Sequence, residues 1–529
     1  MKSEQLELKE NLKDIRFDET IIMFGFNKGD YLECLKESIC EKNKVYIIDP
    51  SDNEYEQYKY KINDKNISII SMSDENIDFI LSEIINSKNF FNFNVQIYEN
   101  YDVLYEEEWI KLKKIIDSLY DKYSVYLSTM ETFKKITLEN ILSNLNEINN
   151  SCKFDSYINV NKDVPCIVVS AGPSLDKNLK VMIENKDKLD KFFIIAGNRT
   201  LNPLLENGIK PDAVISVDPQ DITYDMMKDS FYEKVPLIYC EKSNCKLVRE
   251  YEGKKIIVSQ GALNSIKSLN DMIVCMSGGS VAHTCTDIAF LLGCNPIIFV
   301  GQDFAYTNEK NHALVAKNKI DSDFNKEECT IIKDINGEDI YSCDILNLYK
   351  ENLESMLKLY IQLNKDIEFK NASYGANIDY AKHEELSNIL NYNYKDKKIN
   401  IDDVGENINI NTEEIVFSIK NYLDQTKNNI KKSKNICENI LKHPNQDNIM
   451  QFGLVLKCID DFIKNENNVY IENYISSFLV YIKEKLFNMK SSDYDKLSKD
   501  IIYQCKVFRD YMNELDLLLS EISAVVSQF

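Results

Sequence analysis

Small and polar residues follow an apolar run near residue 170 in a pattern suited to phosphate binding. Residues 167–176 read I-V-V-S-A-G-P-S-L-D, which predicts a buried strand, a turn of small residues and the start of a helix. Gly172 allows the backbone to approach a ligand closely, Pro173 suits the first helical turn, and Ser174 is a capping residue. Free N–H groups at such a helix start can hold a phosphate. The alternative is an ordinary turn between a strand and a helix.

Two further predicted strands end in polar side chains. Residues 192–196 lead into Gly197-Asn198-Arg199-Thr200, and residues 214–217 lead into Asp218-Pro219-Gln220. Arg199 is one of four arginines, and its planar guanidinium suits a phosphate or carboxylate, while Asn198 could contact a ribose or a base edge. Because open α/β sheets bind ligands at the carboxyl ends of their strands, we expect these strand ends to form one site. The alternative is a helix cap at Asn198 beside a solvated Arg199.

A second helix start of this kind lies near residue 280. Ser277-Gly278-Gly279-Ser280 precedes a largely apolar stretch that runs to residue 292. Glycines flanked by serines at a helix start favour an anion. His283 falls in the first turns of this helix, where we expect it to pack or cap.

A histidine follows the next predicted strand. Residues 297–300 lead into Gly301-Gln302-Asp303-Phe304-Ala305-Tyr306, and His312 lies in the polar loop beyond. Loops after strand ends often display catalytic residues, and the imidazole reference pKa of ~6.5 suits a general base. Asp303 could orient this histidine or bind an acceptor. An ordinary surface histidine is the alternative.

Several familiar catalytic patterns are absent from the sequence. It contains no G-x-x-x-x-G-K-[ST], no G-x-S-x-G and no H-E-x-x-H. The fourteen cysteines never occur as C-x-x-C, and Asp218-Pro219-Gln220-Asp221 has the wrong spacing for D-x-D. We therefore expect no metal and no bound cofactor. Residues 24–30, with Asp49 about twenty residues further on, resemble a degraded nucleotide-binding turn, and a structural turn is the favoured alternative.

Short apolar runs alternate with helical patterns over most of the chain. Runs at 21–24, 45–48, 67–70 and 95–98, and again at 166–170, 192–196, 213–217, 237–240, 255–258 and 296–301, predict parallel strands. The sequence thus predicts an α/β protein: two Rossmann-like α/β domains with mostly parallel sheets, followed by a C-terminal α-helical bundle. The expected divisions are an N-terminal domain at 1–135, a helix and an Asn-rich linker at 136–163, a central domain at 164–395 and a helical domain at 396–529.

The helical domain is predicted from its periodicity. Helices are expected at 412–442, 446–465, 467–489 and 494–526. Apolar residues at 501, 505, 508, 512, 515, 519, 522 and 526 step by four and three. This stripe predicts core packing, with a partner-binding face as the alternative.

Charge and hydropathy limit the classes of partner that we expect for this protein. The chain of 529 residues has 63 Lys and Arg against 85 Asp and Glu, a net charge of −22, which disfavours nucleic acid and anionic membrane surfaces. The mean hydropathy is −0.34, and the charged N-terminus has no signal-peptide pattern. We expect a cytoplasmic protein without membrane contact, and a homo-oligomer is compatible with the sequence.

At these motifs the sequence resembles the Maf family, the motility accessory factors. The resemblance rests on VVSAGPSLDKN, IIAGNRTLNPLLENGIKPDAVISVDPQ and SGGSVAHTCTDIAFLLGCNPIIFVGQDFAYTNEKNHA, within residues 165–385. The resemblance continues on both sides of this segment, to a methyltransferase-like N-terminal domain and a C-terminal helical domain in the same order as in the family. One departure is Ser373-Tyr374-Gly375-Ala376, where the family often has Glu-Gly-Gly-Ala.

The resemblance implies a glycosyltransferase that moves a nonulosonic acid of pseudaminic or legionaminic type. The donor would be CMP-activated, the acceptor Ser or Thr of flagellin, and the reaction inverting, metal-independent and required for flagellum assembly and motility. The central domain is similar to bacterial CMP-sialic-acid sialyltransferases, which implies catalytic His312 and Asp303. The residues expected to bind the CMP-sugar are Ser170, Gly172, Pro173, Ser174, Asn198, Arg199, Thr200, Asp218, Gln220, Ser277, Gly278, Gly279, Ser280, Gln302 and Tyr306.

Two other functions stay open from the sequence. Some relatives of the central domain resemble a pterin pyrophosphokinase, which would need ATP and Mg²⁺. The other function is that of a non-catalytic flagellin-binding factor, which would act through the C-terminal helices.

Overall fold

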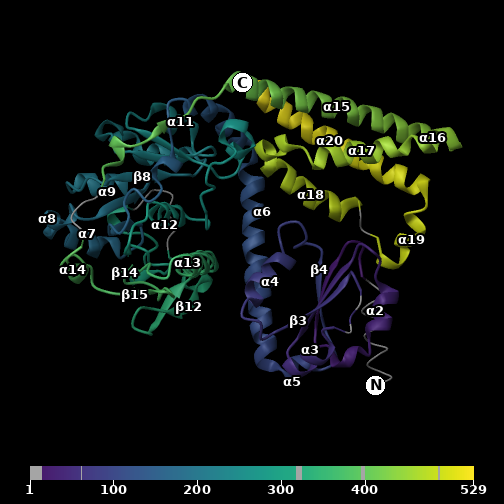
Figure 1. Ribbon diagram of the computed structural model, residues 1–529, viewed down its shortest axis with the longest axis horizontal. Coiled ribbons are helices and arrows are strands. Elements are labelled where there is room, and N and C mark those ends of the chain that lie inside the picture. Colours follow the sequence, from purple (N-terminus) through teal and green to yellow (C-terminus); the bar gives the residue numbers. More distant parts are fainter. Residues whose placement is uncertain (1–14, 61, 63, 317–323, 395–398, 487–488) are drawn as a thin grey trace. The chain divides into compact units, whose positions relative to one another are not determined.

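The computed structural model describes residues 15–529 except 61, 63, 317–323, 395–398 and 487–488 (Figure 1). The charged stretch at 1–14, used above against a signal peptide, lies outside the described residues. The chain divides into two compact units. The first joins the N-terminal part, up to Lys134, to residues 419–528, and the second contains residues 135–418.

The first unit is built on a parallel sheet of four strands in the order β3-β2-β1-β4. Its strands are β1 (Thr20–Phe24), β2 (Lys44–Asp49), β3 (Ile67–Ser71) and β4 (Phe93–Ile97), so the four predicted strands are confirmed. Every residue of β1 is buried, as expected for a central strand covered on both faces. The accompanying helices are α2 (Leu32–Ser38), α3 (Asp52–Tyr58), α4 (Ile77–Ile84), α5 (Tyr101–Leu104) and the long α6 (Glu106–Ile148).

The turn after β1 is packed by tyrosines. Gly25 has a φ of +97°, and a Cβ at this position would overlap the ring of Tyr101. The Tyr31 hydroxyl donates to the Gly25 carbonyl oxygen at 2.9 Å. These contacts favour the structural explanation of the turn, because the protein's own rings lie where a ligand would approach.

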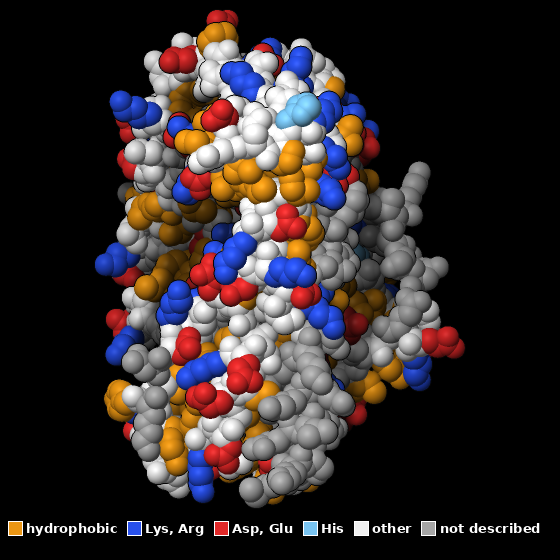
Figure 2. All heavy atoms as spheres, turned by 90° about the vertical axis from the view of Figure 1, so that its right-hand side faces the viewer, with side chains coloured by type: hydrophobic (Ala, Val, Ile, Leu, Met, Phe, Trp, Pro, Cys, Tyr) orange, Lys and Arg blue, Asp and Glu red, His pale blue; other side chains and the backbone are white. Residues whose placement is uncertain are grey.

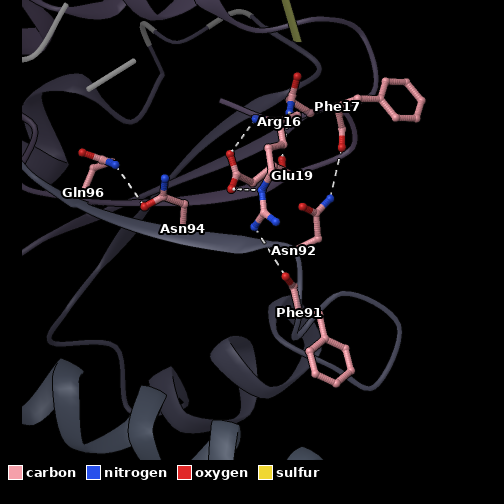
Figure 3. A network of polar contacts seen from close by, with 8 residues as sticks. Arg16, Phe17, Glu19, Phe91, Asn92, Asn94 and Gln96 are labelled. Carbon is pink, nitrogen blue, oxygen red and sulfur yellow. Dashed lines mark hydrogen bonds and ion pairs between the residues drawn. The ribbon is translucent and has the colours of Figure 1, made fainter. Parts of the chain in front are cut away.

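Polar contacts fix the segment that enters the sheet (Figure 3). Arg16 donates through its backbone N–H to Glu19 Oε2 at 2.9 Å and through Nη2 to the Phe91 carbonyl oxygen at 3.4 Å. Asn92 Nδ2 donates to the Phe17 carbonyl oxygen at 3.1 Å. The segment before β1 is therefore tied to the loop before β4.

The C-terminal helices confirm the predicted periodicity, although the helices expected at 446–465 and 494–526 are each divided in two. They are α15 (Thr412–Lys442), α16 (Gln446–Met450), α17 (Phe452–Ile463), α18 (Glu472–Leu486), α19 (Tyr494–Leu497) and α20 (Ile501–Val526). The helix expected at 494–526 is interrupted because Asp500 caps α20, accepting from the N–H groups of Ile502 and Tyr503. The predicted stripe is largely core, with Cys505, Met512, Leu515, Leu519, Ile522 and Val526 buried. Figure 2 shows acidic and basic side chains interspersed over one face of the molecule.

The second unit contains a ten-stranded sheet in the order β15-β14-β11-β6-β7-β8-β9-β10-β5-β16. The six predicted strands are β6 (Cys166–Val169), β7 (Phe193–Gly197), β8 (Ala213–Ser216), β9 (Leu237–Cys240), β10 (Lys255–Val258) and β11 (Ile297–Val300). Three further strands were not predicted: β14 (Phe369–Asn371), β15 (Ala381–His383) and β16 (Glu406–Asn407). Only the β5–β16 pair in this sheet is antiparallel.

The Asn-rich stretch taken as a linker is part of this unit. It contributes β5 (Cys152–Lys153), which pairs with β10, and it buries Phe154 and Tyr157 in the core. Asn161 of this stretch is buried and accepts a hydrogen bond from the Ile399 N–H at 2.7 Å, which is a structural role. Polar composition therefore misled the prediction.

Helices flank the sheet of the second unit: α7 (Leu175–Glu184), α8 (Lys186–Leu189), α9 (Leu201–Glu206), α10 (Asp221–Met227), α11 (Cys245–Glu250), α12 (Val281–Leu291), α13 (Asp344–Leu363) and α14 (Leu386–Ile389). A separate hairpin joins β12 (Thr330–Lys333) and β13 (Asp339–Ser342). Among the described helices, none is both long and apolar enough to cross a bilayer.

Candidate functional site

A cavity of about 410 Å³ lies at the carboxyl ends of β11, β6, β7 and β8, which are neighbours in the sheet. Parallel pairing brings these strand ends to one edge, as the sequence predicted. The predicted residues that line the cavity are Ser170, Gly172, Asn198, Arg199, Thr200, Asp218, Gln220, Gly279, Ser280, Gln302, Asp303 and His312. Pro173, Ser174, Ser277, Gly278 and Tyr306 do not line it.

The turn at 172–174 does not offer its N–H groups to an anion. The Gly172 N–H donates to the Gly301 carbonyl oxygen at 2.8 Å, and the Ser174 N–H donates to Asp303 Oδ2 at 3.0 Å. A Cβ on Gly172 would overlap Gly301 and Asp303. The glycine is therefore needed for contact between β6 and β11, and the prediction that these two N–H groups are free to hold a phosphate is wrong.

Asp303 is the carboxylate that holds this turn. Its Oδ1 accepts hydrogen bonds from the Ser174 hydroxyl and, at 2.8 Å, from the Thr307 hydroxyl. Ser174 Oγ in turn accepts from the Tyr374 N–H at 2.7 Å, so Ser174 does not cap α7 as predicted. Burial raises the pKa of Asp303 to about 6, although both hydroxyls favour its ionised form.

The segment that departs from the family pattern packs on the backbone of Asp303. A Cβ on Gly375 would overlap the backbone of Asp303, and the Ala376 N–H donates to the Asp303 carbonyl oxygen at 2.7 Å. The 373–376 segment thus supports Asp303, which lines the cavity.

Charged side chains converge at the ends of β7 and β8. Burial raises the pKa of the Asp218 carboxyl, and this rise is opposed by the charge of Arg199 and a hydrogen bond from Asn198. Asn198 Oδ1 also accepts from the Arg199 N–H at 3.0 Å. Among the described residues that line the cavity, Arg199 is the one Lys or Arg side chain. It is partly neutralised by Asp218.

Two more predicted residues link neighbouring strand ends. The Ser170 hydroxyl donates to Gln302 Oε1 at 2.6 Å. The Thr200 hydroxyl donates to the carbonyl oxygens of Val169 and Gly197, each at 3.1 Å. Thr200 therefore has a structural role at the cavity wall.

The start of α12 is closed by a capping box. Ser280 Oγ accepts from the Ala282 N–H at 3.4 Å, and His283 Nδ1 accepts from the Ser280 N–H at 3.1 Å. His283 is fully buried, and its Nε2 lies 2.8 Å from the Tyr349 carbonyl oxygen. The prediction that His283 packs and caps is confirmed. Burial lowers its pKa.

The loop that carries His312 lies against the turn that follows β6. His312 and Asn311 line the cavity, and the Ala313 N–H donates to the Ala171 carbonyl oxygen at 3.0 Å. Tyr306 instead packs against Phe324, with ring centroids 5.3 Å apart.

Helix α13 contributes cavity residues that were not predicted from the sequence. Leu346 and Tyr349 line the cavity from this helix, far along the chain from the motifs. A Cβ on Gly279 would meet the Tyr349 ring at 2.8 Å, so Gly279 makes room for α13, whereas a Cβ on Gly278 would meet the ring of His283. The apolar spacing of α13 gives no sign that one of its side chains reaches a site.

Within the described parts of the chain, no group of three or more His, Cys, Asp or Glu side chains is arranged to hold a metal ion. Metal independence stays a prediction.

Comparison with known proteins gives two kinds of likeness. Residues 139–309 match the model of the family described as 6-hydroxymethylpterin diphosphokinase MptE-like. The 6-hydroxymethyl-7,8-dihydropterin pyrophosphokinase of Methanocaldococcus jannaschii is 24% identical over 191 residues, which cover 34% of this chain and 77% of that protein. The MAf glycosyltransferase structure from Magnetospirillum magneticum AMB-1 aligns with a TM-score of 0.59 at 14% identity. It covers 96% of this chain and 79% of that one, and this likeness establishes a shared fold.

Proposed function

We propose that this protein is a glycosyltransferase of the Maf type that transfers a nonulosonic acid from a CMP-activated donor to Ser or Thr of flagellin. The extent of the fold likeness carries the proposal. The Maf glycosyltransferase aligns with 96% of this chain, and so with both units, whereas the pterin enzyme matches 34% of it. The predicted cytoplasmic location and role in flagellum assembly belong to this proposal.

The cavity offers groups for each part of the reaction. The acceptor hydroxyl oxygen would attack the anomeric carbon as the bond from this carbon to the phosphate oxygen breaks and CMP leaves. His312 would take the hydroxyl proton, and Arg199 would compensate the phosphate charge. Attack opposite the leaving phosphate inverts the anomeric centre.

The role that we propose for Asp303 differs from the one predicted from the sequence, which was to orient His312 or bind an acceptor. Its carboxylate is engaged by Ser174 and Thr307, which favours a role in shaping the cavity edge. We therefore assign the general base to His312 alone.

The second candidate is a pterin pyrophosphokinase that uses ATP and Mg²⁺. The match of residues 139–309 to the MptE-like family favours it. The same cavity would then hold a nucleoside triphosphate, with Asp218 as a carboxylate facing the metal.

Thermal unfolding in the presence of nucleotides separates these functions. A ligand at 100 times its Kd adds roughly 2.7 kcal/mol to the free energy of unfolding. We expect CMP to raise the unfolding temperature without Mg²⁺ and R199A to abolish the shift. A shift with ATP and Mg²⁺ alone would favour the pterin kinase, and no shift with any nucleotide would favour the flagellin-binding factor.

Transfer itself needs a direct assay. Purified flagellin incubated with protein and CMP-pseudaminic or CMP-legionaminic acid should gain the mass of the sugar. H312A should bind CMP normally and lower the rate of transfer by on the order of 10²- to 10⁴-fold, which leaves a slow residual transfer that can be measured.

A further inference from the structure

The loop that carries His312 is attached to α7 by one carboxylate. Asp176 lies in the first turn of α7. Its Oδ2 accepts from the Leu314 N–H at 2.9 Å and its Oδ1 from the Val315 N–H at 3.2 Å. These two N–H groups begin the short 3-10 helix Leu314–Ala316, two residues after His312. The Asp176 side chain, which belongs to α7, thus caps the start of a separate 3-10 helix.

Apolar burial contributes little at the two capped positions. The side chains of Leu314 and Val315 are 62% and 43% exposed, although Ala313 is fully buried. The Ala313 N–H adds one hydrogen bond to the Ala171 carbonyl oxygen. Among the described contacts, the backbone after His312 is therefore held by the two hydrogen bonds to Asp176 and the one to Ala171, together with the buried side chains of Ala313 and Ala316.

We propose that Asp176 is a positioning residue that holds His312 at the cavity. The proposal rests on the proposed function, since it takes His312 as the general base. A base must lie within hydrogen-bonding reach of the proton that it removes, and a displacement of about 1 Å can cost on the order of 100-fold in rate. Loss of the carboxylate frees the loop end without removing any group from the reaction.

The simpler role for Asp176 is stabilisation of α7. An acidic residue in a first helical turn interacts favourably with the helix dipole. That role predicts a loss of stability with no specific effect on the chemical step, so the two roles differ in their kinetics.

The test compares D176A, D176N and H312A in the full chain, with D500A as a matched control. Asp500 also accepts from two backbone N–H groups, both at 3.0 Å, at the start of α20 in the other unit. We expect D176A to lower kcat for transfer about 10- to 100-fold with little change in the KM for the CMP-sugar. D176N keeps one acceptor oxygen and should fall in between, and D500A should match the wild type.

A double variant shows whether Asp176 acts through His312. In the H312A background, D176A should lower kcat by less than about twofold, because interacting residues are not additive. An equal loss in both backgrounds, or an unchanged kcat in D176A alone, would overturn the proposal.

Two measurements do not depend on the transfer reaction. Hydrogen exchange of the peptide covering 311–316 should be at least tenfold faster in D176A. The ring signal of His312, assigned by comparing wild type with H312Q in protein labelled at its four histidines, should shift in D176A and not in D500A. If the wild type transfers no sugar, the proposed function fails. Even then, an unchanged exchange rate or ring signal in D176A would refute the attachment itself.

Discussion

Replacing Ser174 by Ala tests the role assigned to Asp303. The Ser174 hydroxyl donates to the Asp303 carboxylate and accepts from the Tyr374 N–H. A hydrogen bond to a charged group contributes about 1.5–3 kcal/mol, and a buried N–H left without an acceptor costs about 1–3 kcal/mol. We expect S174A to lower the free energy of unfolding of the second unit by about 3 kcal/mol at pH 7.5.

The effect of S174A should depend on pH. A carboxyl whose folded pKa is raised contributes stability that is complete below its unfolded pKa and is lost as pH rises through the folded value. For Asp303 that window runs from about 4 to about 6. Without the hydroxyl, the folded pKa rises further and the loss continues to higher pH. The destabilisation should therefore be roughly 1 kcal/mol smaller at pH 5, where Asp303 is mostly protonated.

Native-state hydrogen exchange at β11 measures this free energy within the second unit. The single tryptophan, Trp109, packs on Phe24 in the first unit, so its fluorescence reports on the other part of the chain. Exchange is corrected for the intrinsic rate at each pH. S355A is the control, because the Ser355 hydroxyl donates to the Glu351 carbonyl oxygen on an exposed part of α13. A cost below about 1 kcal/mol, or one that is equal at both pH values, would refute the reasoning.

Two other substitutions test packing around the cavity by thermal unfolding. G375A should cost about 3 kcal/mol because its Cβ overlaps the Asp303 backbone, whereas G453A, with open space around it in α17, should stabilise by up to about 1 kcal/mol; equal effects would contradict the packing argument. N140A should cost about 2–4 kcal/mol, since the buried amide donates to the Pro219 and Lys242 carbonyl oxygens and accepts from the Cys245 N–H. An unchanged unfolding temperature in N140A would show that α6 does not hold the loop after Asp218.

The strands that could be predicted from the sequence are apolar runs closed by polar residues. Ile167–Val169 and Ile297–Val300 are buried in the core, and their ends meet because parallel pairing leaves no other arrangement. The 149–163 stretch could not be assigned, because asparagine is read as a loop residue unless its bonding partners are known. Here the partners lie far along the chain, as for Asn161 and Ile399. Tyr349 was not predicted as a cavity residue because the residues beside it in the cavity also lie far along the chain.

The glycine and serine motifs were located correctly and interpreted wrongly at two points. A turn with Gly, Pro and Ser serves a phosphate only if its N–H groups are free, and sequence does not show which carboxylate faces them. In this chain Asp303 and Gly301 take those of Ser174 and Gly172. At α12, His283 accepts from the Ser280 N–H and Ser280 Oγ accepts from the Ala282 N–H, so these two groups are also engaged. An anionic donor would then depend on Arg199, with Asn198 and Gln302 beside it in the cavity wall. Because Asp218 already offsets part of the Arg199 charge, an anion would be held by a single shared cation rather than by a backbone cradle.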